Sequence, residues 1–108
     1  MARTTRRVTR APTENAAKLL AHVPDEKVFW CQDGRVFHNL QDMADAFQTM
    51  SLETFSYHAN DSKNDFCNWV RDVIGDEKLV QDLMKAKTPS QAAQMVSDRI
   101  SYLKKLPR

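Results

Sequence analysis

Apolar residues recur at helical spacing along most of the chain after residue 39. Leu40, Met43, Ala44 and Phe47 lie at positions i, i+3, i+4 and i+7, which places them on one face of a helix. Further apolar stripes cover 52–55, 66–74, 79–83 and 92–103, and a looser one covers 14–22 before Pro24. Each stripe follows a polar residue suited to capping a helix, and the expected caps are Thr13, Asn39, Ser51, Ser62, Asp76 and Thr88.

Residues 28–38 have a different pattern, which predicts a two-stranded β-hairpin. Asp33-Gly34 is a pair that tolerates positive φ, so we expect it to form a two-residue turn that places Trp30 opposite Phe37. Both faces of this hairpin are then apolar, and helices must cover at least one of them. We expect Trp69, in the middle of a helical stripe, to be buried against the hairpin. The face carrying Val28, Trp30 and Phe37 is a candidate interaction surface.

These patterns predict a mainly α (α+β) fold, a compact bundle of about five or six short helices with one β-hairpin near residues 28–38. An apolar content of 42% suffices for a core, and 108 residues are typical of one domain. We expect that domain to cover 13–106. Residues 1–12 lack apolar periodicity and are expected to form a disordered basic arm.

Charge is unevenly distributed along the chain. The overall net charge is +2, but residues 1–10 contain Arg3, Arg6, Arg7 and Arg10 and no acid. Residues 11–103 contain nine basic and fourteen acidic side chains, a net charge of −5. Arginine binds phosphate through two parallel hydrogen bonds, and basic N-terminal arms are typical of nucleic-acid binders. The four arginines are therefore the candidate nucleic-acid-binding residues, and any duplex contact should be dominated by the arm.

The sequence contains no recognisable catalytic motif. Phosphate-binding glycine loops, nucleophile elbows and His-Glu-x-x-His motifs are all missing, so we predict that the protein is not an enzyme. Cys31, His38, His58 and Cys67 do not have the close paired spacing of structural zinc ligands, and no metal or cofactor is expected. The longest apolar run is four residues, and no secretory signal is recognised. We therefore expect a cytoplasmic protein with no membrane contact.

The densest group of polar side chains lies between residues 58 and 65, just before Phe66. It could form a recognition loop that presents His58 and Asn64 beside an aromatic surface. Alternatively, these side chains cap the following helix and fix the connection. The second interpretation is favoured, and the first leaves His58 and Asn64 as candidate interaction residues.

From the hairpin onward, the chain resembles a family of small prokaryotic helical domains, many of them archaeal, with no assigned function. The resemblance covers roughly residues 28–100, and Asn64-Asp65-Phe66 with Trp69 is its most specific part. It also rests on Phe37, Met50-Ser51, Phe55, Tyr57-His58, Lys63, Asp72-Val73 and Gly75-Asp76-Glu77. The family implies a compact accessory module and carries over no functional residue; the basic arm is not part of its pattern.

Together these observations favour a non-enzymatic interaction module whose arm contacts the nucleic-acid backbone. The alternative is a protein–protein adaptor or regulatory domain that uses the hairpin face or the 58–65 loop. A protein partner or weak homo-oligomer would then explain an uncovered apolar face.

Overall fold

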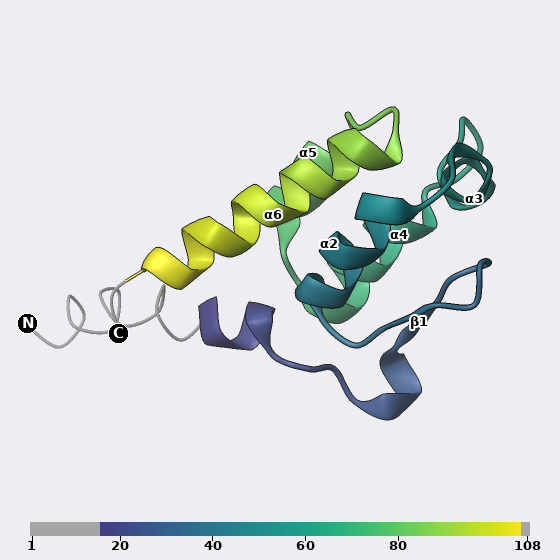
Figure 1. Ribbon diagram of the computed structural model, residues 1–108. Helices are drawn as coiled ribbons and strands as arrows, with labels where there is room; N and C mark the ends of the chain where they lie inside the picture. The colour runs from purple at the N-terminus through teal and green to yellow at the C-terminus, as the bar shows by residue number, and fades with distance from the viewer. Residues whose placement is uncertain (1–15, 107–108) are drawn as a thin grey trace, which may run out of the picture.

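The computed structural model describes residues 16–106, which fold mainly into helices (Figure 1). A helical segment over 16–20 is followed by a 3-10 turn, a hairpin and a series of helices. Their order is η1 (Asp25–Lys27), β1 (Phe29–Trp30), β2 (Val36–Phe37), α2 (Leu40–Thr49), α3 (Leu52–His58), α4 (Asp65–Trp69), the π-helix η2 (Val70–Ile74), α5 (Glu77–Leu83) and α6 (Pro89–Lys105). The predicted mainly α fold with one antiparallel hairpin is confirmed. The arm and Thr13 lie outside the described residues.

Side-chain caps start the helices at most of the predicted positions. Asn39, Ser51, Asp76 and Thr88 each accept a hydrogen bond from the backbone N–H three residues later, at 2.8 to 3.2 Å. The predicted cap Ser62 is wrong, because α4 begins later and Asn64 accepts from the N–H of Cys67 at 3.0 Å. Each of these bonds satisfies an N–H that has no partner within its helix.

The register of the hairpin differs by one residue from the prediction. Phe29 pairs with Phe37, and Trp30 pairs with Val36. The N–H of Gly34 donates to the carbonyl of residue 31 at 3.0 Å, and Gly34 has φ +97°. The loop therefore has three residues, 32–34, and Gly34 supplies the positive φ that such loops commonly need.

This register changes which side chains share a face, because neighbouring residues on a strand point to opposite sides. Phe29 and Phe37 lie together on the buried face, with ring centroids 5.0 Å apart. Phe37 is completely buried and Val28 is half-buried, whereas Trp30 is 72% exposed. The expectation that Val28, Trp30 and Phe37 form one surface is therefore wrong, and only Trp30 presents a large apolar side chain to solvent there.

Helix α4 continues without a break into η2, and Gly75 ends this helical segment. Gly75 has φ +88°, a conformation that glycine adopts without strain. The N–H groups of Gly75 and Asp76 both donate to the carbonyl of Val70, at 2.7 and 3.2 Å. Gly75 is thus the predicted stop, and it lets Asp76 start α5 immediately afterwards.

An aromatic cluster joins the hairpin to α2, α3 and α4. Its neighbouring ring centroids are 5.0 to 6.5 Å apart. Trp69 is buried there as predicted, and its indole N–H donates to the carbonyl of Lys27 at 2.8 Å. The cluster consists of Phe29, Phe37, Phe47, Phe55, Phe66 and Trp69.

The rest of the core lies where α6 crosses the middle of the molecule, packed along α2 and α5 (Figure 1). Leu40 and Met43 of α2 and Val96 of α6 are completely buried. The same core cluster extends from Ala16 to Leu103, so it connects the first described helical segment with the last helix.

Candidate functional site

His58, the last residue of α3, has both ring nitrogens engaged inside the molecule. Its Nδ1 lies 3.0 Å from a carboxylate oxygen of Asp65, and its Nε2 accepts the backbone N–H of Gln32 at 2.9 Å. Because Nε2 accepts, the ring hydrogen is on Nδ1, and Nδ1–H donates a hydrogen bond to the carboxylate of Asp65. The imidazole also packs against Phe29 and Phe66, with centroids 5.1 Å away in each case. His58 therefore links the hairpin to α3 and α4.

Asp65 is the charged member of this cluster. The same oxygen that accepts from His58 also lies 2.9 Å from Nζ of Lys63. Partial burial raises the pKa of Asp65, but the hydrogen bonds from His58 and Lys63 and the charge of Lys63 lower it by more. The net result is a pKa below the usual 3.8, so the carboxylate is ionised at neutral pH.

The loop between α3 and α4 satisfies its own polar groups. Asn60 accepts from the N–H groups of Ser62 and Lys63, and Ala59 forms a β-bridge with Asn64. Asn64 uses its side-chain oxygen as a helix cap. The buried His58 and the side-chain oxygen of Asn64 therefore help to fix this connection, with Asn64 and not Ser62 as the cap. A general acid or base needs a nitrogen within reach of a substrate, and His58 has no nitrogen left for one.

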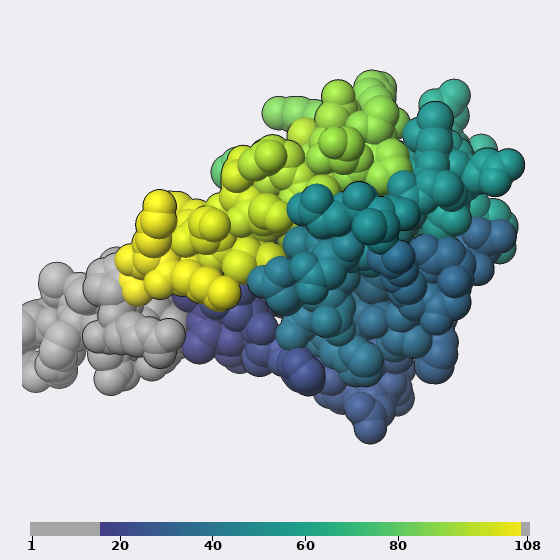
Figure 2. All heavy atoms as spheres, in the orientation of Figure 1, coloured from purple at the N-terminus to yellow at the C-terminus, as the bar shows by residue number. Residues whose placement is uncertain are grey.

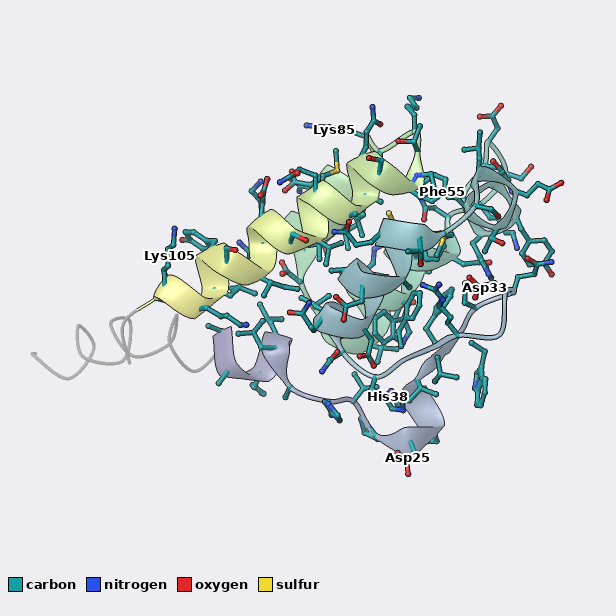
Figure 3. The ribbon with its side chains drawn as sticks, viewed as in Figure 1. Asp25, Asp33, His38, Phe55, Lys85 and Lys105 are labelled. Atoms are coloured by element: carbon teal, nitrogen blue, oxygen red, sulfur yellow. The ribbon has the colours of Figure 1, made fainter. Side chains whose placement is uncertain are left out.

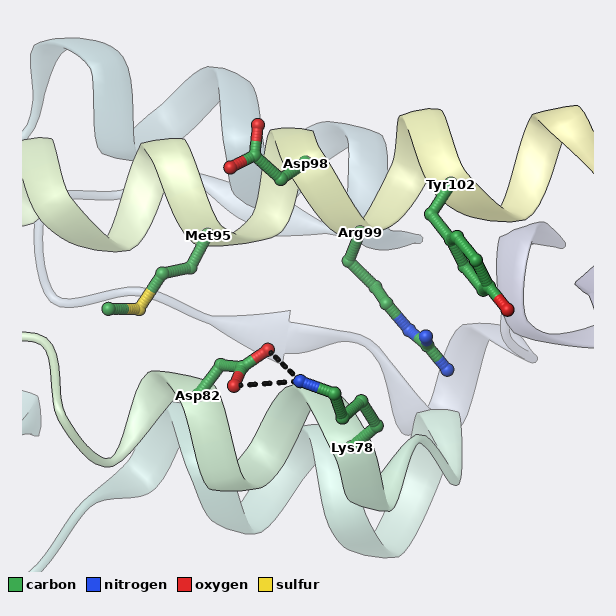
Figure 4. Close-up of a pocket in the computed structure, with 6 residues that line it drawn as sticks. All are labelled: Lys78, Asp82, Met95, Asp98, Arg99 and Tyr102. Atoms are coloured by element: carbon green, nitrogen blue, oxygen red, sulfur yellow. Dashed lines mark hydrogen bonds and ion pairs between the residues drawn. The ribbon is translucent and has the colours of Figure 1, made fainter.

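A groove of about 450 Å³ lies between α5 and α6 (Figure 4). Its two cations already have carboxylate partners: Arg99 donates two hydrogen bonds to Asp76 at 2.8 and 3.0 Å, and Lys78 contacts Asp82 at 3.0 and 3.1 Å. Asp76 is only 2% exposed, and such buried bidentate pairs hold elements in register. The sequence did not predict the Asp76–Arg99 pair, because its members lie on different helices.

The cysteines and histidines do not converge on a metal-binding arrangement within residues 16–106, where no suitable group of three His, Cys, Asp or Glu occurs. Cys31 and Cys67 are free and buried, and burial raises the pKa of the Cys67 thiol to about 11. His38 instead bonds to Asp42 at 2.9 Å. Across the same described range, the helices are too short or too polar to cross a membrane.

The two ends of the described chain lie at the same end of the molecule. Residues 16–20 lie beside the C-terminal end of α6 (Figures 1 and 2), and Ala16 belongs to the same core cluster as Leu103. Lys18, Lys104 and Lys105 are exposed there, and none pairs with a carboxylate among residues 16–106. The segments 16–24 and 99–106 contain four cations, Arg99 included, and no acid.

Arg3, Arg6, Arg7 and Arg10 lie outside the described residues, but their segment joins the folded part of the chain at this end. We call the exposed side chains of Lys18, Lys104 and Lys105 the terminal lysine patch. The sequence signals that could have found it are the basic residues near both ends of the chain. Only the packing of α6 brings those ends together.

No family model matches this chain, and neither does a curated protein or a solved structure. The resemblance to small prokaryotic helical domains therefore stays a prediction.

Proposed function

We propose that this protein is a non-enzymatic interaction module that contacts the nucleic-acid backbone through Arg3, Arg6, Arg7 and Arg10. The observation that carries the proposal is the distribution of charge. Four guanidinium groups precede a folded part whose nearest segments, 16–24 and 99–106, contain cations and no carboxylate. A phosphate backbone approaching the arm therefore meets no negative side chain from these two segments.

The charge of the folded part as a whole does not favour binding to nucleic acid. Residues 16–106 carry eleven basic and thirteen acidic side chains, a net charge of −2. Attraction to phosphate must then come from the terminal end of the molecule. Contacts of this kind recognise the backbone and not the bases, so affinity should vary little with nucleotide sequence.

The test compares the full chain with a chain lacking residues 1–12, titrated with a DNA duplex at several salt concentrations. If the four arginines each neutralise one phosphate, they contribute roughly −3.6 to the slope of log affinity against log salt. Deletion should remove that contribution and leave the melting temperature nearly unchanged.

Two matched variants distinguish charge from chain length. Replacing the four arginines by glutamine should weaken binding as the deletion does, whereas replacing them by lysine should retain most of it. Equal affinity for the full and shortened chains, or no binding by the full chain at low salt, would refute the proposal.

One observation favours a second candidate function, a protein–protein adaptor that uses the hairpin. Trp30 is 72% exposed on β1, and tryptophan is among the residues most enriched at protein interfaces. This function predicts weak self-association that Trp30→Ser abolishes. Sedimentation of both proteins at high concentration tests it, and a monomeric wild-type protein would leave self-association without support.

A further inference from the structure

The terminal lysine patch comes from two segments far apart in the sequence. Lys18 belongs to the first described helical segment, whereas Lys104 and Lys105 close α6. All three are exposed, and Lys105 is labelled at the free end of the helix in Figure 3. Cations near a helix C-terminus also compensate the helix dipole, and each of the three lysines lies in the last turn of its own helical segment. The dipole does not explain why the two segments that carry these lysines lie side by side where the described chain begins.

We propose that the terminal lysine patch is a second phosphate-binding surface, contributed by the folded part of the protein in addition to the arm. Its partner is the backbone of the same nucleic acid. This inference rests on the proposed function and revises the sequence-based expectation that the arm dominates any duplex contact. The arm and the patch together contain up to seven cations available to phosphates.

The number of phosphates contacted determines how steeply binding depends on salt. Four contacts on duplex DNA correspond to a slope of roughly −3.6, and seven correspond to roughly −6.3. Lysine binds phosphate as a point charge on a flexible stem, so the patch does not require a fixed geometry. The slope therefore distinguishes an arm acting alone from an arm acting with the patch.

The chain offers a matched control at the other end of the same helix. Lys85 and Lys87 are also exposed, and they lie before the start of α6, which has 17 residues. At 1.5 Å per residue they are separated from the patch by roughly 25 Å. Figure 3 labels Lys85 and Lys105 at opposite ends of α6. Replacing either pair by glutamine changes the net charge equally and keeps a good helix former at the helical positions.

The test titrates a DNA duplex into the full chain, the double variant Lys104→Gln/Lys105→Gln and the control Lys85→Gln/Lys87→Gln. We expect the first variant to lose roughly tenfold or more in affinity at low salt and to reduce the magnitude of the slope by about 1.8. The control should stay within about twofold of the wild type. Lys104→Arg/Lys105→Arg should retain binding, which distinguishes loss of charge from damage to the helix end.

The outcomes separate this inference from the proposed function. Equal losses in the two glutamine variants would indicate a general effect of net charge and would overturn the patch. Unchanged binding by Lys104→Gln/Lys105→Gln, with binding lost on deletion of the arm, would overturn the patch and leave the proposed function standing. Failure of the full chain to bind would refute both.

Discussion

Polar side chains have opposite environments at two ends of this molecule. We call the end that carries β1 and β2 the hairpin end, and the end where residues 16–20 lie beside the end of α6 the terminal end. At the hairpin end, His58 bonds to both Asp65 and the N–H of Gln32, and the indole N–H of Trp69 donates to a backbone carbonyl. At the terminal end, Lys18, Lys104 and Lys105 have no carboxylate partner among residues 16–106.

This difference separates polar groups that stabilise the fold from polar groups that are available to a ligand. His58, a residue type often found in active sites, serves the fold because both of its nitrogens are occupied. The three lysines are exposed and form no ion pair with a carboxylate of the described residues, 16–106. Substitutions at the hairpin end should therefore change stability, and substitutions at the terminal end should change binding.

The largest effect on stability is expected at Trp69. Trp69→Ala leaves a cavity in the aromatic cluster and an unpaired carbonyl at Lys27, so the free energy of unfolding should fall by about 3–5 kcal/mol. Chemical denaturation measures this loss, and Trp69→Phe, which keeps most of the ring volume, should lose clearly less. A loss below about 1 kcal/mol for Trp69→Ala would contradict the burial of this side chain.

The second-largest loss of stability is expected at His58. His58→Ala removes the acceptor for the N–H of Gln32 and the donor to Asp65, and the free energy of unfolding should fall by about 2–4 kcal/mol. His38→Ala is the matched control, because that imidazole also bonds to an aspartate but its side chain is 44% exposed. The control should lose less than about 1 kcal/mol. Similar losses for both variants in urea titrations would remove the distinction between a buried and an exposed pair.

A smaller effect is expected from titration of Asp65. Its pKa is lower in the folded state than in the unfolded state, so the unfolded chain binds more protons as the pH falls. The stability it contributes is fully present above the unfolded pKa near 3.8 and is lost as the pH falls through the folded value. Urea denaturation between pH 5 and 2 should therefore show a shallower decline for Asp65→Asn than for the wild type. Parallel profiles would mean that Asp65 is not stabilised by its partners.

The smallest effect on stability should occur at Trp30. Because its side chain is mostly exposed, Trp30→Ser should change the free energy of unfolding by no more than about 0.5 kcal/mol. Its fluorescence should also be quenched by iodide far more readily than that of Trp69. Strong protection of Trp30 from the quencher would show that something covers this face in solution.

Local signals made much of the fold predictable. Asn39, Ser51, Asp76 and Thr88 cap helices through bonds to residues only three positions away, so the relevant chemistry lies within a short window of sequence. The apolar stripe around Trp69 likewise identified its burial.

The features that sequence analysis missed depend on contacts between distant residues. Asp33-Gly34 is compatible with a two-residue turn and with a three-residue loop that places Gly34 in the left-handed region. The observed register places Phe29 and Phe37 together, where both reach the aromatic cluster. Local sequence cannot decide between these registers, because the deciding partners, such as Phe66 and Trp69, lie some 30 residues away.

Separation along the chain also explains why sequence analysis did not predict the terminal lysine patch. Lys18 and Lys105 are separated by most of the chain, and the amino-acid pattern contains no signal for their proximity. The segments that carry them lie side by side because α6 packs along α2 and ends beside residues 16–20. The candidate residues of the arm were visible in the sequence, but their neighbours on the folded surface were not.

The packing of α2 against α6 also determines when the core can form during synthesis on the ribosome. A ribosome delivers the chain from the N-terminus at roughly 5–20 residues per second. Leu40 and Met43 of α2 leave it long before Val96 and Leu103, the residues of α6 that complete the same core. During that interval the apolar face of α2 lacks its final cover, so the nascent chain should stay exposed to chaperones and proteases until α6 has emerged. A chain that stops before Pro89 should therefore be degraded or aggregate in place of accumulating as a smaller folded domain.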